Sequence, residues 1–325
     1  MKRKQSGFKI MMRLIKLVKP LAFFMVLAVI LGVTGFLCAI QITVLGSMTL
    51  LTAAGINGGL AIKTGCICII IFAVLRGFLH YGEQACNHYI AFKLLALIRD
   101  KVFKSLRRLT PAKLEGKDKG NLISLITSDI ELLEVFYAHT ISPICIAFLT
   151  SLVMLIFIGR YSSWLMLVAL AAYITVGIII PLASSKFNKN IGMTYRENSG
   201  ALSGYVLDSM RGLLESIRYN STDIRLNEMN EKTDELNSLQ KKLKKIEGHN
   251  ISITDISIIF FSITMLLVAI CLYQKGTIGF DGLIVSTVAM MSSFGPVAAL
   301  SNLAGNLTHT LASGERVLSI LDESP

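Results

Sequence analysis

Six stretches of apolar residues, each about as long as a membrane crossing, constrain the fold of this 325-residue chain more than any other feature. A transmembrane helix needs about 20 predominantly apolar residues. The stretches cover residues 21–45, 60–79, 141–158, 164–182, 251–273 and 282–300. Only 16% of the residues are charged, whereas soluble domains average about 25%. The sequence therefore predicts an all-α membrane protein with six transmembrane helices.

The basic residues predict how these helices are oriented. Of the 32 Lys and Arg residues, 28 lie before the first stretch, in the two long connections or after the last stretch, which places them on one side. The positive-inside rule then puts both termini in the cytoplasm of a multi-pass cell-membrane protein. In the connections, basic residues alternate with acids such as Glu228 and Asp234. This mixture indicates a solvated surface near membrane lipid and argues against nucleic-acid binding.

The two cytoplasmic connections, residues 80–140 and 183–250, have a helical pattern. In the second, apolar or near-apolar residues recur at heptad-like spacing, which is typical of paired helices. They are Leu202, Val206, Met210, Leu213 and Ile217 before the turn, and Leu226, Met229, Thr233, Leu236, Leu239, Leu243 and Ile246 after it. We therefore expect the spanning helices to continue into the cytoplasm as two long helical hairpins.

Each hairpin needs a turn, and helix-breaking residues mark both positions. Residues 110–120 are rich in Pro, Gly and charge, and residues 219–223 read Tyr-Asn-Ser-Thr-Asp. The last three of these can cap a short helix that follows.

The N-terminal stretch is basic and amphipathic. The first apolar stretch is longer than the 7–15-residue core of a signal peptide, so we expect it to be retained. Residues 8–19 before it should form a helix in the plane of the membrane interface. Lys9, Arg13 and Lys16 line one face of this helix, and Ile10, Met11, Leu14 and Val18 fall largely on the other.

Three local patterns resemble the transmembrane domain of ATP-binding-cassette exporters. Residues 120–129, Gly-Asn-Leu-Ile-Ser-Leu-Ile-Thr-Ser-Asp, resemble the segment after the family's first intracellular turn. Residues 208–215 are similar to the segment that enters the second turn. Residues 313–325 are similar to the stretch joining the sixth helix to the nucleotide-binding domain. The resemblance covers essentially the whole chain, and the order and spacing of the patterns are specific.

Within the family, the sequence is similar to the subgroup that contains the cysteine/glutathione exporters of cytochrome bd assembly. The residues that carry this similarity are Arg76-Gly77, His80 to Gln84, His88, residues 109–114 and Ile141-Ser142-Pro143. Some members of the subgroup hold haem near the position matched by His88. Here Gln84 stands where a basic residue is expected, so we expect a hydrogen-bonded packing role for His88 and no haem.

The resemblance implies that the two turns are short coupling helices that dock on ATPase domains. ATP-driven closure of those domains would be transmitted by the stiff arms to give alternating access and solute export. The first coupling helix would span about residues 110–118, and the second about 218–226, mainly on the opposite subunit's ATPase. The candidate coupling residues are Pro111, Lys113, Leu114, Glu115, Tyr219, Asn220, Asp223 and Arg225.

The resemblance also divides the chain into an interfacial helix (1–19), a six-helix domain (20–310) and a linker (311–325) toward an ATPase domain that the sequence does not contain. No G-x-x-x-x-G-K-[ST] motif occurs in the 325 residues, so ATP and Mg²⁺ should bind to a partner ATPase. The chain itself has no expected catalytic or metal-binding residue. A second transmembrane half, identical or related, is the other expected partner. A non-transporting scaffold or sensor, and a truncated half-transporter, remain alternatives.

Ionisable residues within apolar spans usually face a cavity or a partner. On the second span, Arg76, His80, Glu83 and Asn87 share one helical face. On the last helix, Asn302, Asn306 and His309 form a second polar set below Gly295-Pro296, which belongs either to a gate or to polar contacts between helices. Two interpretations of the first set are open. It lines a path for a small zwitterionic or anionic solute, or it is structural, with Arg76 paired to Glu83 or with Glu83 reaching the cytoplasmic interface.

Overall fold

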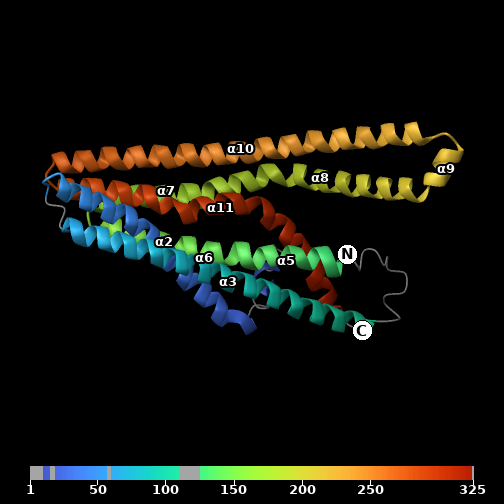
Figure 1. Ribbon diagram of the computed structural model, residues 1–325, viewed down its shortest axis with the longest axis horizontal. Coiled ribbons are helices and arrows are strands. Elements are labelled where there is room, and N and C mark those ends of the chain that lie inside the picture. Colours follow the sequence, from blue (N-terminus) through green and yellow to red (C-terminus); the bar gives the residue numbers. More distant parts are fainter. Residues whose placement is uncertain (1–9, 15–18, 57–59, 110–124, 324–325) are drawn as a thin grey trace.

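The computed structural model, which describes residues 10–14, 19–56, 60–109 and 125–323, is an elongated arrangement of long helices, with no strand among these residues (Figure 1). The first two spans form an antiparallel pair that packs along its length. Its helices are α2 (Ala22–Ala53), which follows the short 3-10 turn η1 (Lys19–Leu21), and α3 (Ile62–Leu109). A left-handed glycine, Gly55 (φ 79°), ends α2 and allows the chain to reverse.

The third and fourth spans are continuous rods that contain wider, π-helical turns. The third rod comprises η2 (Leu125–Asp129), α5 (Ile130–Phe136), η3 (Tyr137–Ile141) and α6 (Ser142–Gly159). The fourth comprises α7 (Ser163–Ile174), η4 (Thr175–Ile179) and α8 (Ile180–Arg211). Between them, the Ser162 hydroxyl accepts a hydrogen bond from the Trp164 N–H at 3.3 Å, which caps α7.

The last three helices complete the fold. They are α9 (Leu213–Arg218), α10 (Thr222–Gln274) and α11 (Phe280–Leu321). With 53 residues, α10 is about 80 Å long at 1.5 Å per residue. It runs beside α7 and α8, and α9 crosses the far end of this hairpin (Figure 1). Helix α11 contains Pro296 and changes direction toward α5 (Figure 1).

The core is divided between the two ends of the bundle. One cluster of buried apolar side chains joins the spanning parts of α2, α6, α7, α10 and α11 and includes Met154, Leu165 and Met265. A second joins α3, α5, the end of α11 and the helical segment 10–14 and includes Ile98 and Leu133. The second cluster holds parts of α3, α5 and α11 together with the N-terminal segment.

The predicted fold class is confirmed. Among the residues that the structure describes, six helices are long and apolar enough to cross a membrane, and they coincide with the six apolar stretches of the sequence. In the α8–α10 hairpin, the heptad-like residues from Met229 to Ile246 are less exposed than the residues between them, as paired helices require. The predicted first turn, residues 110–120, lies outside the described residues.

The predicted position of the short helix at the second turn is wrong by several residues. It lies before the turn, as α9 (Leu213–Arg218), and not after it, because the chain from Thr222 onward already belongs to α10. Gly212 ends α8, and the Gly212 N–H donates to the Asp208 carbonyl oxygen at 2.9 Å. Asn220 (φ 48°) then adopts the left-handed conformation that stops a helix and that Asn tolerates.

Candidate functional site

The tip of the α8–α10 hairpin presents apolar side chains to solvent. Leu213, Leu214, Ile217 and Tyr219 are 52%, 79%, 60% and 78% exposed. Burying such side chains is favourable by about 1.5–3 kcal/mol each, so a cluster of them on a polar rod is typical of a contact surface. The candidate residues Tyr219 and Asn220 lie at this tip, on the turn that follows α9.

Behind the tip, polar contacts fasten the two arms to each other. The Tyr205 hydroxyl of α8 donates a hydrogen bond to Glu228 Oε2 of α10 at 2.5 Å, and this bond raises the pKa of Tyr205. The guanidinium of Arg225, a predicted coupling residue, lies 5.3 Å from the centre of the Tyr205 ring. Asp223 lies exposed in the first turn of α10. Arg225 therefore braces the hairpin, and the apolar residues of α9 form the outermost surface.

The four polar residues of α3 do not form one continuous stripe. Arg76 and His80 are exposed, whereas Glu83 and Asn87 are buried. Glu83 contacts His80 Nδ1 at 3.2 Å and accepts a hydrogen bond from Asn87 Nδ2 at 3.3 Å. No Arg76–Glu83 ion pair forms among the described residues, because residues three or four apart meet on a helix and residues seven apart are two turns away.

A close approach between helices encloses Glu83. A Cβ atom added at Gly32 of α2 would lie 3.3 Å from Glu83 Cδ and 2.3 Å from Ile146 Cδ1 of α6. The glycine thus lets α2, α3 and α6 meet around a buried carboxyl group. Farther along α3, the exposed His88 ring stacks on Phe92, with centroids 6.1 Å apart. Asn302 and Asn306 lie within α11, but their side chains are outside the described part.

A cavity of about 450 Å³ lies between α6, the η4 turn and α11. Its lining is almost entirely apolar, and the polar side chains at its wall are Thr140, Ser151 and Tyr173. The buried Tyr173 and Ser293 hydroxyls are hydrogen bonded to each other at 2.5 Å. Sequence reasoning missed these residues, because isolated Ser, Thr and Tyr residues within an apolar span carry no recognisable pattern.

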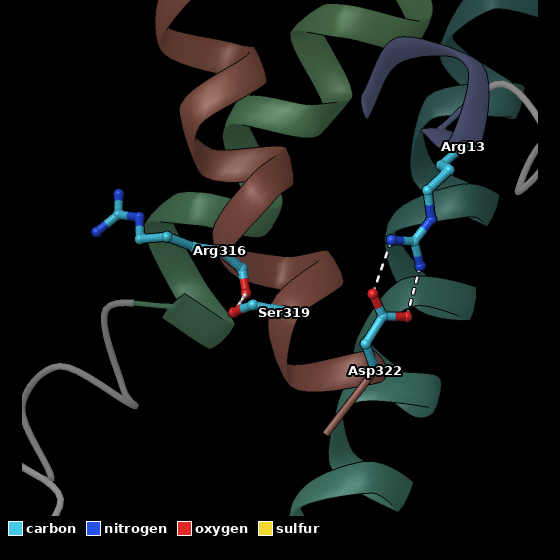
Figure 2. Close-up of polar contacts among 4 residues, drawn as sticks. All are labelled: Arg13, Arg316, Ser319 and Asp322. Carbon is cyan, nitrogen blue, oxygen red and sulfur yellow. Dashed lines mark hydrogen bonds and ion pairs between the residues drawn. The ribbon is translucent and has the colours of Figure 1, made fainter. Parts of the chain in front are cut away.

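The end of α11 is fastened to two other parts of the chain. Asp129 of η2 is buried, and it accepts hydrogen bonds from the Ser313 hydroxyl at 3.0 Å and from the Arg316 guanidinium of α11. Arg13, in the helical segment 10–14, forms a two-pronged ion pair with Asp322 at 2.5 and 2.7 Å (Figure 2). Figure 2 shows Arg316 on α11 and Asp322 directly after the last residue of this helix, with their side chains pointing in different directions. We call these two ion pairs the α11 clasp.

The N-terminal helical segment 10–14 packs against other parts of the chain beside the α11 clasp. Ile10 and Leu14 are 3% and 0% exposed, and the Leu14 carbonyl accepts a hydrogen bond from the buried Tyr137 hydroxyl at 2.8 Å. A Cβ at Gly314 would lie 2.8 Å from Leu14 Cδ1, so a larger residue at this position would force the end of the Leu14 side chain to shift. The predicted apolar face of residues 8–19 is described only for residues 10–14. There, Ile10 and Leu14 pack against α5 and α11.

Comparison with known proteins identifies related sequences. Residues 21–297 match the family described as the ABC transporter transmembrane region. A probable ABC transporter ATP-binding/permease protein of Haemophilus influenzae is 46% identical over 99% of this chain and 58% of its own length.

Two further relatives have more specific names. The glutathione/L-cysteine transport system ATP-binding/permease protein CydC of Haemophilus influenzae is 21% identical over 78% of this chain and 44% of its own length. The ATP-dependent lipid A-core flippase 1 of Colwellia psychrerythraea is 29% identical over 54% and 29%. The chain therefore spans about half, or less, of the length of these relatives.

Proposed function

The chain belongs to the family of ABC transporter transmembrane regions, and we propose that it is a permease whose partner ATPase domain drives solute export by alternating access. A multi-pass membrane domain of this family is a path for cargo. In this function, a partner domain or subunit hydrolyses ATP, an identical or related copy provides a second transmembrane half, and both termini lie on the cytoplasmic side of the cell membrane. The placement of both termini in the cytoplasm is supported by the positions of the basic residues, since 28 of the 32 lie on the same side of the membrane as the termini.

The observation that carries this proposal is the apolar tip on a long, braced hairpin. Exposed apolar residues of α9 lie at the end of arms that run without a break into the fourth and fifth spans. Helices transmit displacement along their axes because each turn is hydrogen bonded to the next. A partner that moves α9 therefore moves the membrane part of α8 and α10. A scaffold needs a docking surface, but it does not need this rigid connection to the spans.

Replacing the two most exposed apolar residues of the tip should uncouple the partner from the membrane domain. In Leu214→Ser/Tyr219→Ser, we expect solute-stimulated ATP hydrolysis by the copurified ATPase to fall about tenfold or more, since two buried apolar contacts of about 1.5–3 kcal/mol are lost. The measurement is phosphate release by the complex reconstituted in vesicles.

The matched control is Asn237→Ser/Gln240→Ser, which changes two exposed positions in the middle of α10. The control should keep wild-type stimulation. If no ATPase associates with the chain, or if the tip variant and the control behave alike, the coupling role of α9 is wrong.

We place Arg76 and His80 in the solute path, and we assign Glu83 and Asn87 to the packing of α3. The first two side chains are exposed, and Arg76 forms no ion pair with another described residue, so a solute carboxylate can reach it. Asn302 and Asn306 remain candidates on α11. A small zwitterionic or anionic solute fits Arg76, and the name of the relative CydC makes glutathione and L-cysteine the first probes to use.

Arg76→Ala should lower ATP-dependent uptake of radiolabelled glutathione or cysteine into inverted vesicles by about tenfold, since a charge-assisted hydrogen bond contributes about 1.5–3 kcal/mol. Expression and thermal stability should be unchanged, because Arg76 is exposed. Lys63→Ala removes a basic residue at the outer end of the same helix and serves as the control. Uptake that is unchanged in Arg76→Ala at normal expression would remove this residue from the path.

The cavity between α6, η4 and α11 favours a second candidate, a lipid-like cargo. Its lining contains no charged side chain, and an acyl chain needs none. The lipid A-core flippase named above makes a lipid a reasonable second probe. Transbilayer movement of a fluorescent lipid that does not change in Arg76→Ala, together with no uptake of glutathione or cysteine by the wild-type protein, would favour this candidate.

A further inference from the structure

Five basic side chains surround a groove of about 790 Å³ at the cytoplasmic end of α3. They are Arg13, Lys101, Lys104, Arg107 and Arg108, and Ser105, Leu318 and Leu321 complete the lining. Lys101, Lys104, Ser105 and Arg108 are spaced three or four residues apart, so they share one face of α3. The groove thus receives residues from α3, from the helical segment 10–14 and from the end of α11.

The positive charge of this groove is only partly neutralised. Asp322 pairs with Arg13, and Asp100 pairs with Lys104 at 2.8 Å. Among the described residues, neither Lys101 nor Arg107 forms an ion pair or a side-chain hydrogen bond. Several like charges held this close repel one another, and a bound anion with more than one charge would relieve the repulsion.

We infer that this groove binds a phosphate-bearing anion. Arginine and lysine together suit phosphate, because the guanidinium fork binds two phosphate oxygens and the ammonium adds a point charge. The groove is larger than one phosphate needs, and Leu318 and Leu321 provide an apolar floor for an organic portion of the ligand. The ligand therefore carries phosphate next to apolar atoms, as an anionic lipid headgroup or a soluble organic phosphate does.

The groove lies within reach of the membrane surface. Leu21, near the start of the first span, belongs to the same cluster of buried apolar side chains as Leu95 of α3. Lys101 is six residues farther along α3, which is about 9 Å at 1.5 Å per residue. Basic pockets at this depth on the cytoplasmic side suit lipid phosphates, and the opening to water also admits a soluble phosphate.

Two measurements on the full chain in lipid nanodiscs distinguish a lipid ligand from a soluble phosphate. In the first, nanodiscs of phosphatidylcholine with or without cardiolipin are compared, and the lipid retained by the protein is counted by native mass spectrometry. In the second, pyrophosphate is titrated into phosphatidylcholine nanodiscs, and the thermal unfolding temperature is followed. Retained cardiolipin identifies a lipid ligand, whereas stabilisation by pyrophosphate identifies a soluble one. Either result supports the site.

The variant is Lys101→Gln/Arg107→Gln, which leaves the Arg13–Asp322 pair in place. It should bind the effective ligand about tenfold more weakly, or worse, since two charge-assisted contacts are lost. Lys241→Gln/Lys242→Gln on α10 removes the same charge at exposed positions away from the groove and should behave as the wild-type protein. The inference fails if the wild-type protein binds neither cardiolipin nor pyrophosphate, or if all three proteins bind equally. Because neither measurement requires transport or ATP, the result is independent of the proposed function.

Discussion

Replacing Tyr137 with alanine should lower the free energy of unfolding by about 3–5 kcal/mol, the cost of truncating a fully buried aromatic residue. Tyr137 is 1% exposed and packs among Leu14, Leu133 and the neighbouring apolar residues of α3. The substitution leaves a cavity at the point where the N-terminal segment meets α5. It also removes the hydroxyl group that donates a hydrogen bond to the Leu14 carbonyl oxygen. Unfolding in mixed detergent micelles, followed by circular dichroism, measures the change.

Tyr137→Phe separates the ring from the hydroxyl. It keeps the packing and loses one hydrogen bond, so the expected loss is about 1 kcal/mol. If Tyr137→Ala were no less stable than Tyr137→Phe, the ring would not support the N-terminal segment as its burial indicates.

The hydroxyl also makes stability depend on pH. Burial raises the pKa of Tyr137 above its ordinary value of about 10. A group with a raised pKa in the folded state contributes its full stability below the unfolded pKa and loses it as the pH rises toward the folded one. The free energy of unfolding of the wild-type protein should therefore decrease above about pH 10, and the decrease should be smaller in Tyr137→Phe.

Replacing Arg316 with alanine should destabilise the protein by about 3 kcal/mol. Breaking a buried ion pair costs about 3–5 kcal/mol when the remaining charge has no compensation, and the Asp129 side chain is only 2% exposed. The lower end of that range applies because the Arg316 side chain is 54% exposed and because Ser313 still donates to Asp129. The same unfolding measurement applies.

Two further variants test this explanation. Asp129→Asn/Arg316→Ala removes the charge of both partners and should recover a large part of the loss, since the costly species is a buried carboxylate that has lost its guanidinium partner. Arg211→Ala, at an exposed position near the end of α8, should change stability by no more than about 0.5 kcal/mol. A double variant as unstable as Arg316→Ala alone would show that the guanidinium acts by packing and not by pairing with Asp129.

Most of the helical architecture could be predicted from the sequence. The length of each apolar stretch predicts a span because backbone N–H and C=O groups cannot remain unpaired in lipid. The heptad-like spacing from Met229 to Ile246 predicts the side of α10 that meets α8 because helical periodicity places those residues on one face. Both signals are local, so they need no knowledge of the neighbouring helix.

The details of the candidate site were less predictable. The sequence predicts the short helix of the hairpin tip after the turn at residues 219–223, because Ser, Thr and Asp favour helix starts. Here Thr222 and Asp223 start the long α10, while Gly212 and Asn220 bound α9. Likewise, residues 76, 80, 83 and 87 share a face by periodicity. Their burial depends on Gly32 and Ile146, which belong to other helices.

Hydropathy, periodicity and charge along the chain are sufficient to predict six membrane-crossing helices, a long helical hairpin beyond the fourth and fifth, and the side on which the basic residues collect. Tertiary packing is needed to bring Arg13 to Asp322, to bring Arg316 to Asp129, and to add Arg13 to the basic residues of α3 around one groove. These contacts join residues up to 309 positions apart. Their geometry is set by the packing of α3, α5, α11 and the N-terminal segment, and no local pattern encodes it.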